Sequence, residues 1–147
     1  MDRFTDRILQ ILGSEGRISN VELADRIGLS PSACLRRVQE LERQGVIKGY
    51  RAVVDRERLG IGFQAYVTIG LNEHSQTAQL AFEAAITAAP EVRECHNVTG
   101  GVEYLLRVET PDLAAYKALH TDVIGTAPHV AAITTYVVME SPKDERA

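Results

Sequence analysis

Serine and arginine side chains recur over one short stretch near the N-terminus, where they could bind phosphates or the edges of bases. The stretch reads SPSACLRRVQELER from Ser30 onwards. Free N–H groups at a helix N-terminus and serine hydroxyls can contact phosphates, and arginine can donate two hydrogen bonds to guanine in the major groove. The candidates for DNA contacts are Ser30, Ser32, Ala33, Arg36, Arg37 and Arg43. The alternative is a three-helix bundle whose arginines are only solvated.

Two amphipathic helices are predicted ahead of this stretch. Apolar residues from Phe4 to Leu12 recur at helical spacing, and Gly13 and Gly16 follow. Ser19 is placed to cap the second helix, with Glu22 at the third helical position to complete a capping box. Gly28 suits the left-handed residue just beyond the end of that helix.

A third helix is expected to carry the serines and arginines. Ser30 is a good N-cap and Pro31 a good first helical residue, so the helix should run from about Pro31 to Gln44. Leu35, Val38 and Leu41 are predicted to pack inward. The side chains left outside are Ser32, Arg36, Arg37, Gln39 and Arg43. Two helices joined by a three-residue turn that contains glycine are typical of a helix-turn-helix.

The rest of the chain predicts a second domain of alternating strands and helices. Residues 63–71 alternate with period 2, a helix follows from about Gln76 to Pro90, and VRECHNVTG and EYLLRVET predict two strands. Thr110-Pro111 should open a second helix that ends at Gly125, and AAITTYVVM predicts the last strand. The order βαββαβ is that of a ferredoxin-like antiparallel sheet with two helices on one face, so the chain is assigned to the α+β class. We expect the open face to carry enough apolar side chains for pairing with a second subunit.

These patterns divide the chain into residues 1–48 for the helix-turn-helix, 49–60 for a linker strand and 61–147 for the sheet domain. Charged residues are also distributed unequally between the two parts of the chain. Residues 1–58 hold 11 Lys/Arg and 9 Asp/Glu, whereas residues 59–147 hold 5 and 11. A mildly basic N-terminal part on an acidic remainder suggests two functions on one chain, which the net charge of −4 conceals.

Other classes of protein find little support in the sequence. Apolar runs fall short of the ~20 residues of a membrane span, and the N-terminus MDRFTDRILQ does not resemble a secretory signal, so we expect a cytoplasmic protein without a membrane partner. Cys34 and Cys95 lack the spacing of a disulfide framework or a zinc site, and we expect free, buried or half-buried thiols. Catalytic motifs and shared histidine ligand spacings are missing, so we predict neither an enzyme nor a metal site.

The stretch NVTGGVEY could bind a small molecule. Gly100 and Gly101 would let the backbone approach a ligand closely, with N–H groups available to a carboxylate. Glu103 could accept an ammonium group. A simple glycine hairpin turn explains the same residues equally well.

Three stretches, read together, are similar to a known family. They are GLSPSACLRRVQELERQGVIKGY, ECHNVTGGVEYLLRVETPDLAAYKAL and TYVVMES. In this order, from about Phe4 to Ser141, they resemble the Lrp/AsnC (feast/famine) transcription regulators. The resemblance implies a sheet domain of the RAM/ACT-like kind and double-stranded DNA as a partner. It also implies homodimers that assemble further, into octamers or related discs, and that sense a free amino acid between dimers.

By the same resemblance, one loop and the strand facing it would bind the effector. The residues concerned are Thr99, Gly100, Gly101, Val102, Glu103, Tyr104, Ala132, Thr134 and Tyr136. Where the family often has an acidic residue, an aromatic and Asp after the first glycine, this chain has Gly101, Val102 and Glu103. The loop is therefore emptier and its carboxylate one methylene longer, so the effector could be leucine or another amino acid. A cofactor beyond that effector is not expected.

Two other functions stay open. One is an architectural protein that wraps DNA without a ligand response. The other is an amino-acid-binding regulatory module attached to an enzyme, with the helix-turn-helix as a docking element.

Overall fold

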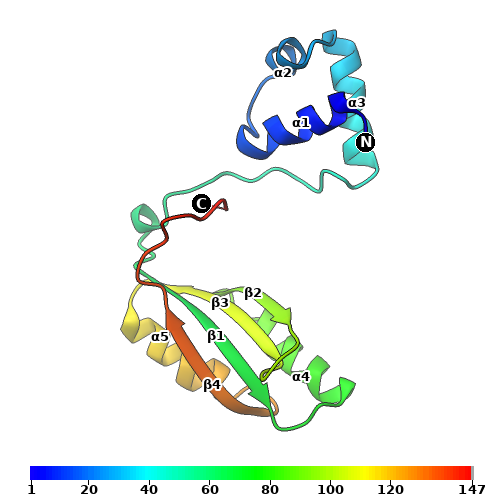
Figure 1. Ribbon diagram of the computed structural model, residues 1–147. Coiled ribbons are helices and arrows are strands. Elements are labelled where there is room, and N and C mark those ends of the chain that lie inside the picture. Colours follow the sequence, from blue (N-terminus) through cyan, green and yellow to red (C-terminus); the bar gives the residue numbers. More distant parts are fainter. Residues whose placement is uncertain (147) are drawn as a thin grey trace. The chain divides into compact units, whose positions relative to one another are not determined.

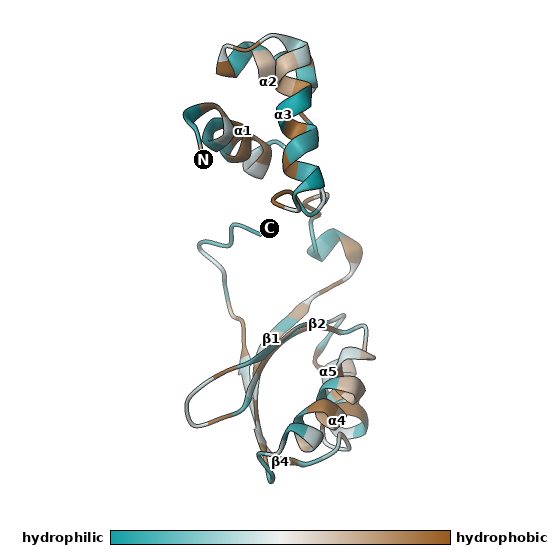
Figure 2. Cartoon of the chain, turned by 90° about the vertical axis from the view of Figure 1, so that its right-hand side faces the viewer, coloured by the Kyte–Doolittle hydropathy of each residue, from teal (hydrophilic) through white to brown (hydrophobic). Residues whose placement is uncertain are grey.

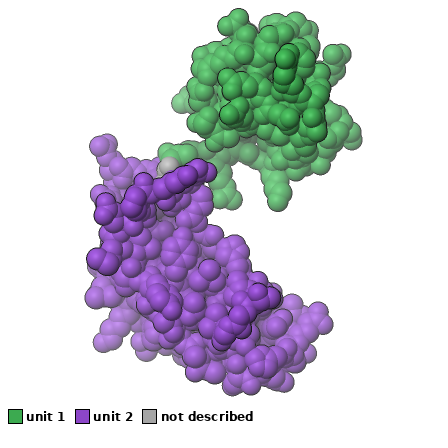
Figure 3. Space-filling view, in the orientation of Figure 1, with its two compact units in different colours: residues 1–53 green, residues 54–147 purple. Residues whose placement is uncertain are grey.

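The computed structural model describes residues 1–146, which form two compact units. One unit is Met1–Val53 and the other begins at Val54 (Figure 3). Each has its own hydrophobic core. They are therefore described separately.

The N-terminal unit consists of three helices, α1 (Arg3–Ser14), α2 (Asn20–Ile27) and α3 (Pro31–Arg43) (Figure 1). The predicted N-caps are confirmed, since Ser19 Oγ accepts the Glu22 N–H at 3.1 Å and Ser30 Oγ accepts the Ala33 N–H at 3.2 Å. Gly28 takes the left-handed conformation that ends α2, with φ of 78°. The core of the unit is formed by Ile8, Ile11, Leu23, Ala24, Ile27, Cys34 and Leu41.

The predicted capping box is only half formed. The Glu22 carboxylate is bound to Arg26 one turn later in α2, at 2.8 Å, where an i,i+4 ion pair forms. Arg26 also contacts Glu15 at 2.5 Å and so joins the end of α1 to α2. Because Arg26 holds the Glu22 carboxylate, that carboxylate does not return to accept the Ser19 backbone N–H.

The strand predicted within residues 49–60 is absent from the described chain. Residues 50–55 have no regular structure, and a 3-10 helix follows at Glu57–Leu59. A strand needs a hydrogen-bonded neighbour, and this segment has none in the four-stranded sheet. The boundary between the units, after Val53, falls inside the segment.

The C-terminal unit is a four-stranded antiparallel sheet with two helices. Its elements are β1 (Phe63–Leu71), α4 (Gln76–Thr87), β2 (Val92–Asn97), β3 (Tyr104–Thr110), α5 (Leu113–Leu119) and β4 (Val130–Val137), with a π-helical turn at His120–Ile124. The strand order is β2-β3-β1-β4, as the predicted ferredoxin-like α+β fold requires. Figure 2 shows both helices on the same side of the sheet.

Alternation along β1 separates the two faces of the sheet as predicted. Ala65, Val67, Ile69 and Leu71 are buried, while the residues between them are only partly covered. Phe82 and Ile86 of α4 complete the core against them. The odd-numbered positions of β1 therefore face the helices, and the even-numbered ones face the open side.

The start of α5 differs from the prediction. Asp112 is its N-cap and accepts the Ala115 N–H at 2.8 Å. Thr110, the predicted start, is the last residue of β3, and its hydroxyl donates to Asp112 O at 2.9 Å. Capping therefore falls two residues later because a strand residue already occupies the expected position.

Candidate DNA-binding and ligand-binding sites

Two contacts from the other helices hold α3 in place. The Asn20 side chain, at the start of α2, donates to Pro31 O at the start of α3, at 2.8 Å. The Arg37 guanidinium donates to the Asp2 carboxylate at 2.6 Å and lies 5.2 Å from the centre of the Phe4 ring. The first contact fixes the N-terminal end of α3, and the second fixes its middle against α1.

Arg37 is therefore not on the outer face of α3, contrary to the prediction. The Arg37 side chain is 33% exposed, and its contacts with Asp2 and Phe4 place it against α1. Arg37 turns toward α1, whose N-cap Asp2 also accepts the Thr5 N–H at 2.8 Å. This backbone hydrogen bond, followed by the one from Arg37, lowers the pKa of Asp2 to about 2.

The exposed face of α3 forms one continuous stripe. Five of its exposed residues recur at the spacing of a helix surface, and they are Ser32, Leu35, Arg36, Gln39 and Arg43. Pro31 and Glu42 of α3 are exposed as well. Leu35 is 44% exposed, so the prediction that it packs inward is wrong. Cys34, one residue earlier, takes the core position and is fully buried. We call the five residues the outer stripe of α3.

The two arginines of the outer stripe differ in their partners. Arg43 is bound to Glu40, at 2.8 Å from Nε and 2.5 Å from Nη2. This contact, together with one from Gln44, lowers the pKa of Glu40 to about 2. Arg36 has no hydrogen bond or ion pair with any residue of 1–146. Its positive charge is thus available to a phosphate or a base.

The remaining predicted DNA contacts lie at the start of α3. Ser30 and Ser32 are exposed, with their hydroxyl oxygens 3.4 Å apart. Ser30 already accepts the cap hydrogen bond, so its hydroxyl can still donate. Ala33 is only partly exposed and contributes its backbone N–H to that cap.

The second candidate site surrounds Glu103, in the loop between β2 and β3. The Glu103 side chain is 18% exposed, and Oε2 accepts the Leu71 N–H at 2.8 Å. A register shift in β1 between Gly70 and Leu71 accompanies this bond. A β-bulge leaves backbone groups without a partner on the neighbouring strand, and the Glu103 carboxylate bonds one of them, the Leu71 N–H. Oε1 lies 3.0 Å from Nδ1 of His74, a side chain that is largely exposed.

The backbone of Glu103 ties the same loop to both neighbours. Its N–H donates to Ile69 O at 3.0 Å, and its carbonyl accepts the Val98 N–H at 2.9 Å and the Asn97 side chain at 3.0 Å. Thr99, Gly100 and Gly101 beyond these bonds are exposed. Gly100 has φ of 125°, which favours glycine. The loop is therefore anchored at its base and open at its tip.

Gly70 is a residue of this site that the sequence interpretation missed. A Cβ at Gly70 would lie 3.4 Å from Ala132 Cβ and 3.7 Å from Glu103 Oε2. Gly70 pairs with Ala132 across β1 and β4. The structure thus brings Glu103, Gly70 and Ala132 together. A glycine inside an alternating strand was the available signal, because it often marks a bulge or a close approach.

The other predicted effector residues differ in how they lie relative to Glu103. Tyr104 is buried on the helix side of the sheet, its ring centre is 4.6 Å from that of Phe82, and its hydroxyl donates to Glu83. Burial, followed by that hydrogen bond, raises the pKa of Tyr104. Thr134 and Tyr136 do face the open side, but they pair with positions progressively farther from Gly70 along β1. Val102 is partly covered beside Glu103.

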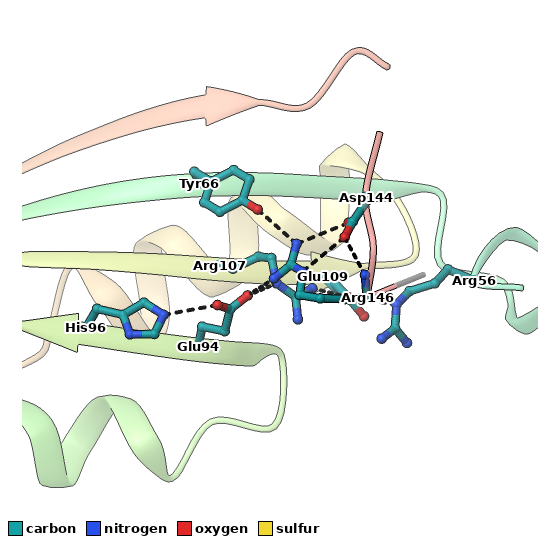
Figure 4. Close-up of polar contacts among 8 residues, drawn as sticks. All are labelled: Arg56, Tyr66, Glu94, His96, Arg107, Glu109, Asp144 and Arg146. Atoms are coloured by element: carbon teal, nitrogen blue, oxygen red, sulfur yellow. Dashed lines mark hydrogen bonds and ion pairs between the residues drawn. The ribbon is translucent and has the colours of Figure 1, made fainter. Parts of the chain in front are cut away.

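The open face of the sheet carries an ion network (Figure 4) beside apolar side chains such as Leu105 and Tyr136. Arg107 of β3 contacts Glu94 and Glu109, Arg56 contacts Glu109 at 2.9 Å, and Arg146 contacts Glu94 and Asp144. We call Arg56, Glu94, Arg107, Glu109, Asp144 and Arg146 the open-face ion network. The sequence interpretation missed this network because the pairing of charges across strands is not visible in the alternation of any one strand.

Glu94 and Glu109 are the anionic centres of the network. Burial alone would raise the pKa of Glu94, but hydrogen bonds from His96 and Arg107 outweigh burial and lower that pKa to about 2. The Glu109 carboxylate is almost fully buried between Arg56 and Arg107. A buried carboxylate that loses its cations is strongly destabilising, so Glu109 depends on Arg56 and Arg107.

Further features bear on other classes of function. No helix among the described residues is long and apolar enough to cross a membrane. Residues 1–146 contain no group of three or more His, Cys, Asp or Glu side chains placed to hold a metal ion. Cys34 and Cys95 are free thiols, the first buried and the second half-buried, as predicted.

Comparisons with known proteins match both units of the chain. Residues 1–48 match the winged helix-turn-helix DNA-binding family, and residues 64–147 match the Lrp/AsnC ligand binding domain. The leucine-responsive regulatory protein of Salmonella typhimurium is 43% identical over 143 residues, which are 97% of this chain and 87% of that protein.

Solved structures agree over the same length. A transcriptional regulator of Neisseria meningitidis, solved as a complex with L-Met, has a TM-score of 0.93 and 33% identity, covering 98% of this chain and 93% of that one. An AsnC family regulator of Agrobacterium tumefaciens has a TM-score of 0.92 and 33% identity, covering 98% and 94%. Both units thus match regulators in sequence and in fold, and the chain belongs to the Lrp/AsnC family of transcriptional regulators.

Proposed function

We propose that the chain regulates transcription by inserting the outer stripe of α3 into the major groove of DNA. The observation that carries this proposal is Arg36, a fully available guanidinium in the middle of an exposed helix face. Asn20 and Arg37 hold that helix from two sides and limit the ordering cost of binding. In this proposal Ser30 and Ser32 contact phosphates, and Arg36 contacts a phosphate or a guanine.

A free amino acid, leucine or another, is the proposed effector. The Neisseria meningitidis relative was solved with L-Met, which supports a ligand of this class. The exposed N–H groups at Gly100 and Gly101 suit its carboxylate, and Glu103 suits its ammonium group. Gly70 lies beside both Ala132 and this carboxylate, because a Cβ there would be 3.4 Å from Ala132 Cβ and 3.7 Å from Glu103 Oε2.

Assembly links the two sites in this proposal. Dimers that associate further, up to an octamer, would present several α3 helices to one DNA and multiply a modest affinity. An amino acid that binds one assembly better shifts the population toward it and changes DNA engagement. The cytoplasm, where bacterial chromosomes lie, is the proposed compartment.

The DNA proposal is tested with a matched pair of variants. Duplexes are first selected from a random library with the wild-type protein, and affinity is then measured by fluorescence anisotropy across a salt series. Arg36→Ala should weaken binding by about 1–3 kcal/mol if it contacts guanine, or reduce the salt slope by about 0.9 if it contacts one phosphate. Arg93→Ala removes the same charge from β2 and should have little effect.

Three outcomes separate the alternatives. Unchanged binding by Arg36→Ala contradicts the assignment of Arg36. A ratio of specific to non-specific affinity near one favours an architectural protein. Failure to bind any DNA at low salt favours an amino-acid-binding module that docks on another protein.

The ligand proposal is tested by thermal shift with the twenty amino acids. A ligand at ~100 times its dissociation constant stabilises the folded protein by ~2.7 kcal/mol. One or a few hits should emerge, and DNA binding is then measured with and without each. No stabilisation by any amino acid contradicts the proposed effector.

A further inference from the structure

Leu35 is an apolar side chain at the centre of the face proposed to meet DNA. It is 44% exposed, while the apolar positions of α3 that face the core are Cys34, Val38 and Leu41. A single exposed leucine on a protein surface needs no explanation by itself. Leu35 is notable because it lies on the face of α3 that is proposed to contact DNA.

Ser32, Arg36 and Gln39, near Leu35 on α3, carry exposed side chains that can form hydrogen bonds, whereas Pro31 and Val38 do not. Ser32 lies three residues before it, Arg36 one residue after and Gln39 four residues after, and all are exposed. Residues three and four apart are neighbours on a helix surface, so Leu35 lies between polar side chains suited to phosphates and base edges. The contacts from Asn20 and Arg37 orient this face, because they fix the start and middle of α3.

The major groove offers one apolar group to such a residue. Thymine presents its C5-methyl group there, whereas the remaining recognition groups of the base edges are hydrogen-bond donors and acceptors. A second protein copy would also suit an exposed leucine, but Arg36, exposed and without a partner among residues 1–146, favours a polyanion as the occupant.

We propose that Leu35 reads the C5-methyl group of a thymine and thereby determines part of the sequence specificity. This inference rests on the proposed DNA-binding function. Burial of one methyl-sized group stabilises by about 0.8 kcal/mol, which corresponds to about a fourfold change in affinity. The methyl contact therefore adds discrimination, while arginine and serine contacts supply most of the affinity.

The test replaces thymines by deoxyuridine one at a time in a duplex selected by the wild-type protein. Deoxyuridine keeps every hydrogen-bonding group and removes only the methyl group. For the wild type, one thymine in each site should show about a fourfold loss of affinity on replacement. Leu35→Ala should bind the unmodified duplex about fourfold more weakly and show no further loss at that thymine.

A matched control comes from α2. Val21 is also apolar and is 66% exposed, so Val21→Ala should keep the wild-type response to every replacement. Because Leu35 is outside the core, Leu35→Ala should fold, which circular dichroism checks. As a second variant, Leu35→Gln should shift the preference at the same position toward adenine, since glutamine can donate to and accept from the adenine edge.

The possible failures are distinct. If Leu35→Ala and the wild type respond equally to every replacement, the thymine contact is wrong although DNA binding stands. If Leu35→Ala changes the mass of the assembly in light scattering and not the uracil response, Leu35 belongs to an interface between subunits. If the wild type binds no duplex, the proposed function fails and this inference with it.

Discussion

Replacement of Glu103 separates the structural role of its carboxylate from its proposed role in ligand binding. One oxygen accepts the N–H of the buried Leu71 at 2.8 Å, and the other faces the exposed His74 at 3.0 Å. Glu103→Gln keeps an acceptor for Leu71 and removes the charge. Glu103→Ala removes both, so the two variants should differ.

The magnitudes follow from these contacts. A hydrogen bond to a charged group contributes about 1.5–3 kcal/mol and a neutral one about 0.5–1.5 kcal/mol. The contact with His74 is largely exposed and adds little. We therefore expect Glu103→Ala to lower the free energy of unfolding of the C-terminal unit by about 2 kcal/mol, and Glu103→Gln by about 1 kcal/mol. For a domain of 60–100 residues, these losses correspond to roughly 10 °C and 5 °C in Tm.

Calorimetry of the full chain measures both values, and the amino-acid panel is then repeated on each variant. Glu103→Gln should remain folded and lose the stabilisation by the effector, because a neutral amide binds ammonium poorly. If both variants melt like the wild type, the bond to Leu71 contributes nothing measurable and the anchoring argument fails. If Glu103→Gln responds to the amino acid like the wild type, the carboxylate does not receive the ammonium group.

Three further outcomes are expected. Because the pKa of Glu94 is lowered to about 2 from 4.5, its stabilisation is complete above pH 4.5 and is lost as pH falls toward 2. pH-dependent unfolding should show this loss, on the order of 3 kcal/mol, and Glu94→Gln should flatten it. Burial raises the pKa of both thiols, so access decides their reactivity. Cys95, which is half-buried, should react with a thiol reagent in the native protein, whereas the fully buried Cys34 should react only after unfolding. Equal rates measured by mass spectrometry would contradict the assigned burial. Arg37→Ala should loosen α3 and raise hydrogen exchange in α1, because it removes the contact with Asp2. Arg36→Ala should leave hydrogen exchange unchanged while weakening DNA binding. Identical hydrogen exchange in the two variants would contradict the proposed role of the Arg37–Asp2 contact.

Local signals in the sequence predicted the positions of most helices and strands. Ser19, Ser30 and Gly28 each act within one turn of a helix, so neighbouring residues suffice to identify their roles. The alternation of β1 was equally readable, because a strand with one buried face repeats every two residues. These signals do not depend on distant parts of the chain.

The errors arose where distant residues decide the outcome. Leu35 and Cys34 are both apolar and adjacent, and only packing against α1 and α2 decides which one is buried. Arg37 likewise appeared as an outer residue because its partner, Asp2, is 35 positions away. Gly70 was missed for the same reason, since its neighbour Glu103 lies in the loop between β2 and β3, far from β1 in the sequence.

The open-face ion network has a consequence for how subunits and DNA respond to salt. Its three arginines are matched by three carboxylates, so the network has no formal net charge although the whole chain carries −4. If subunits pair through this surface, counterions have little to screen, whereas the proposed DNA contact of α3 would depend on counterion release. A rise in ionic strength should then detach the protein from DNA while leaving its assembly intact, so that a salt step would yield the free oligomer.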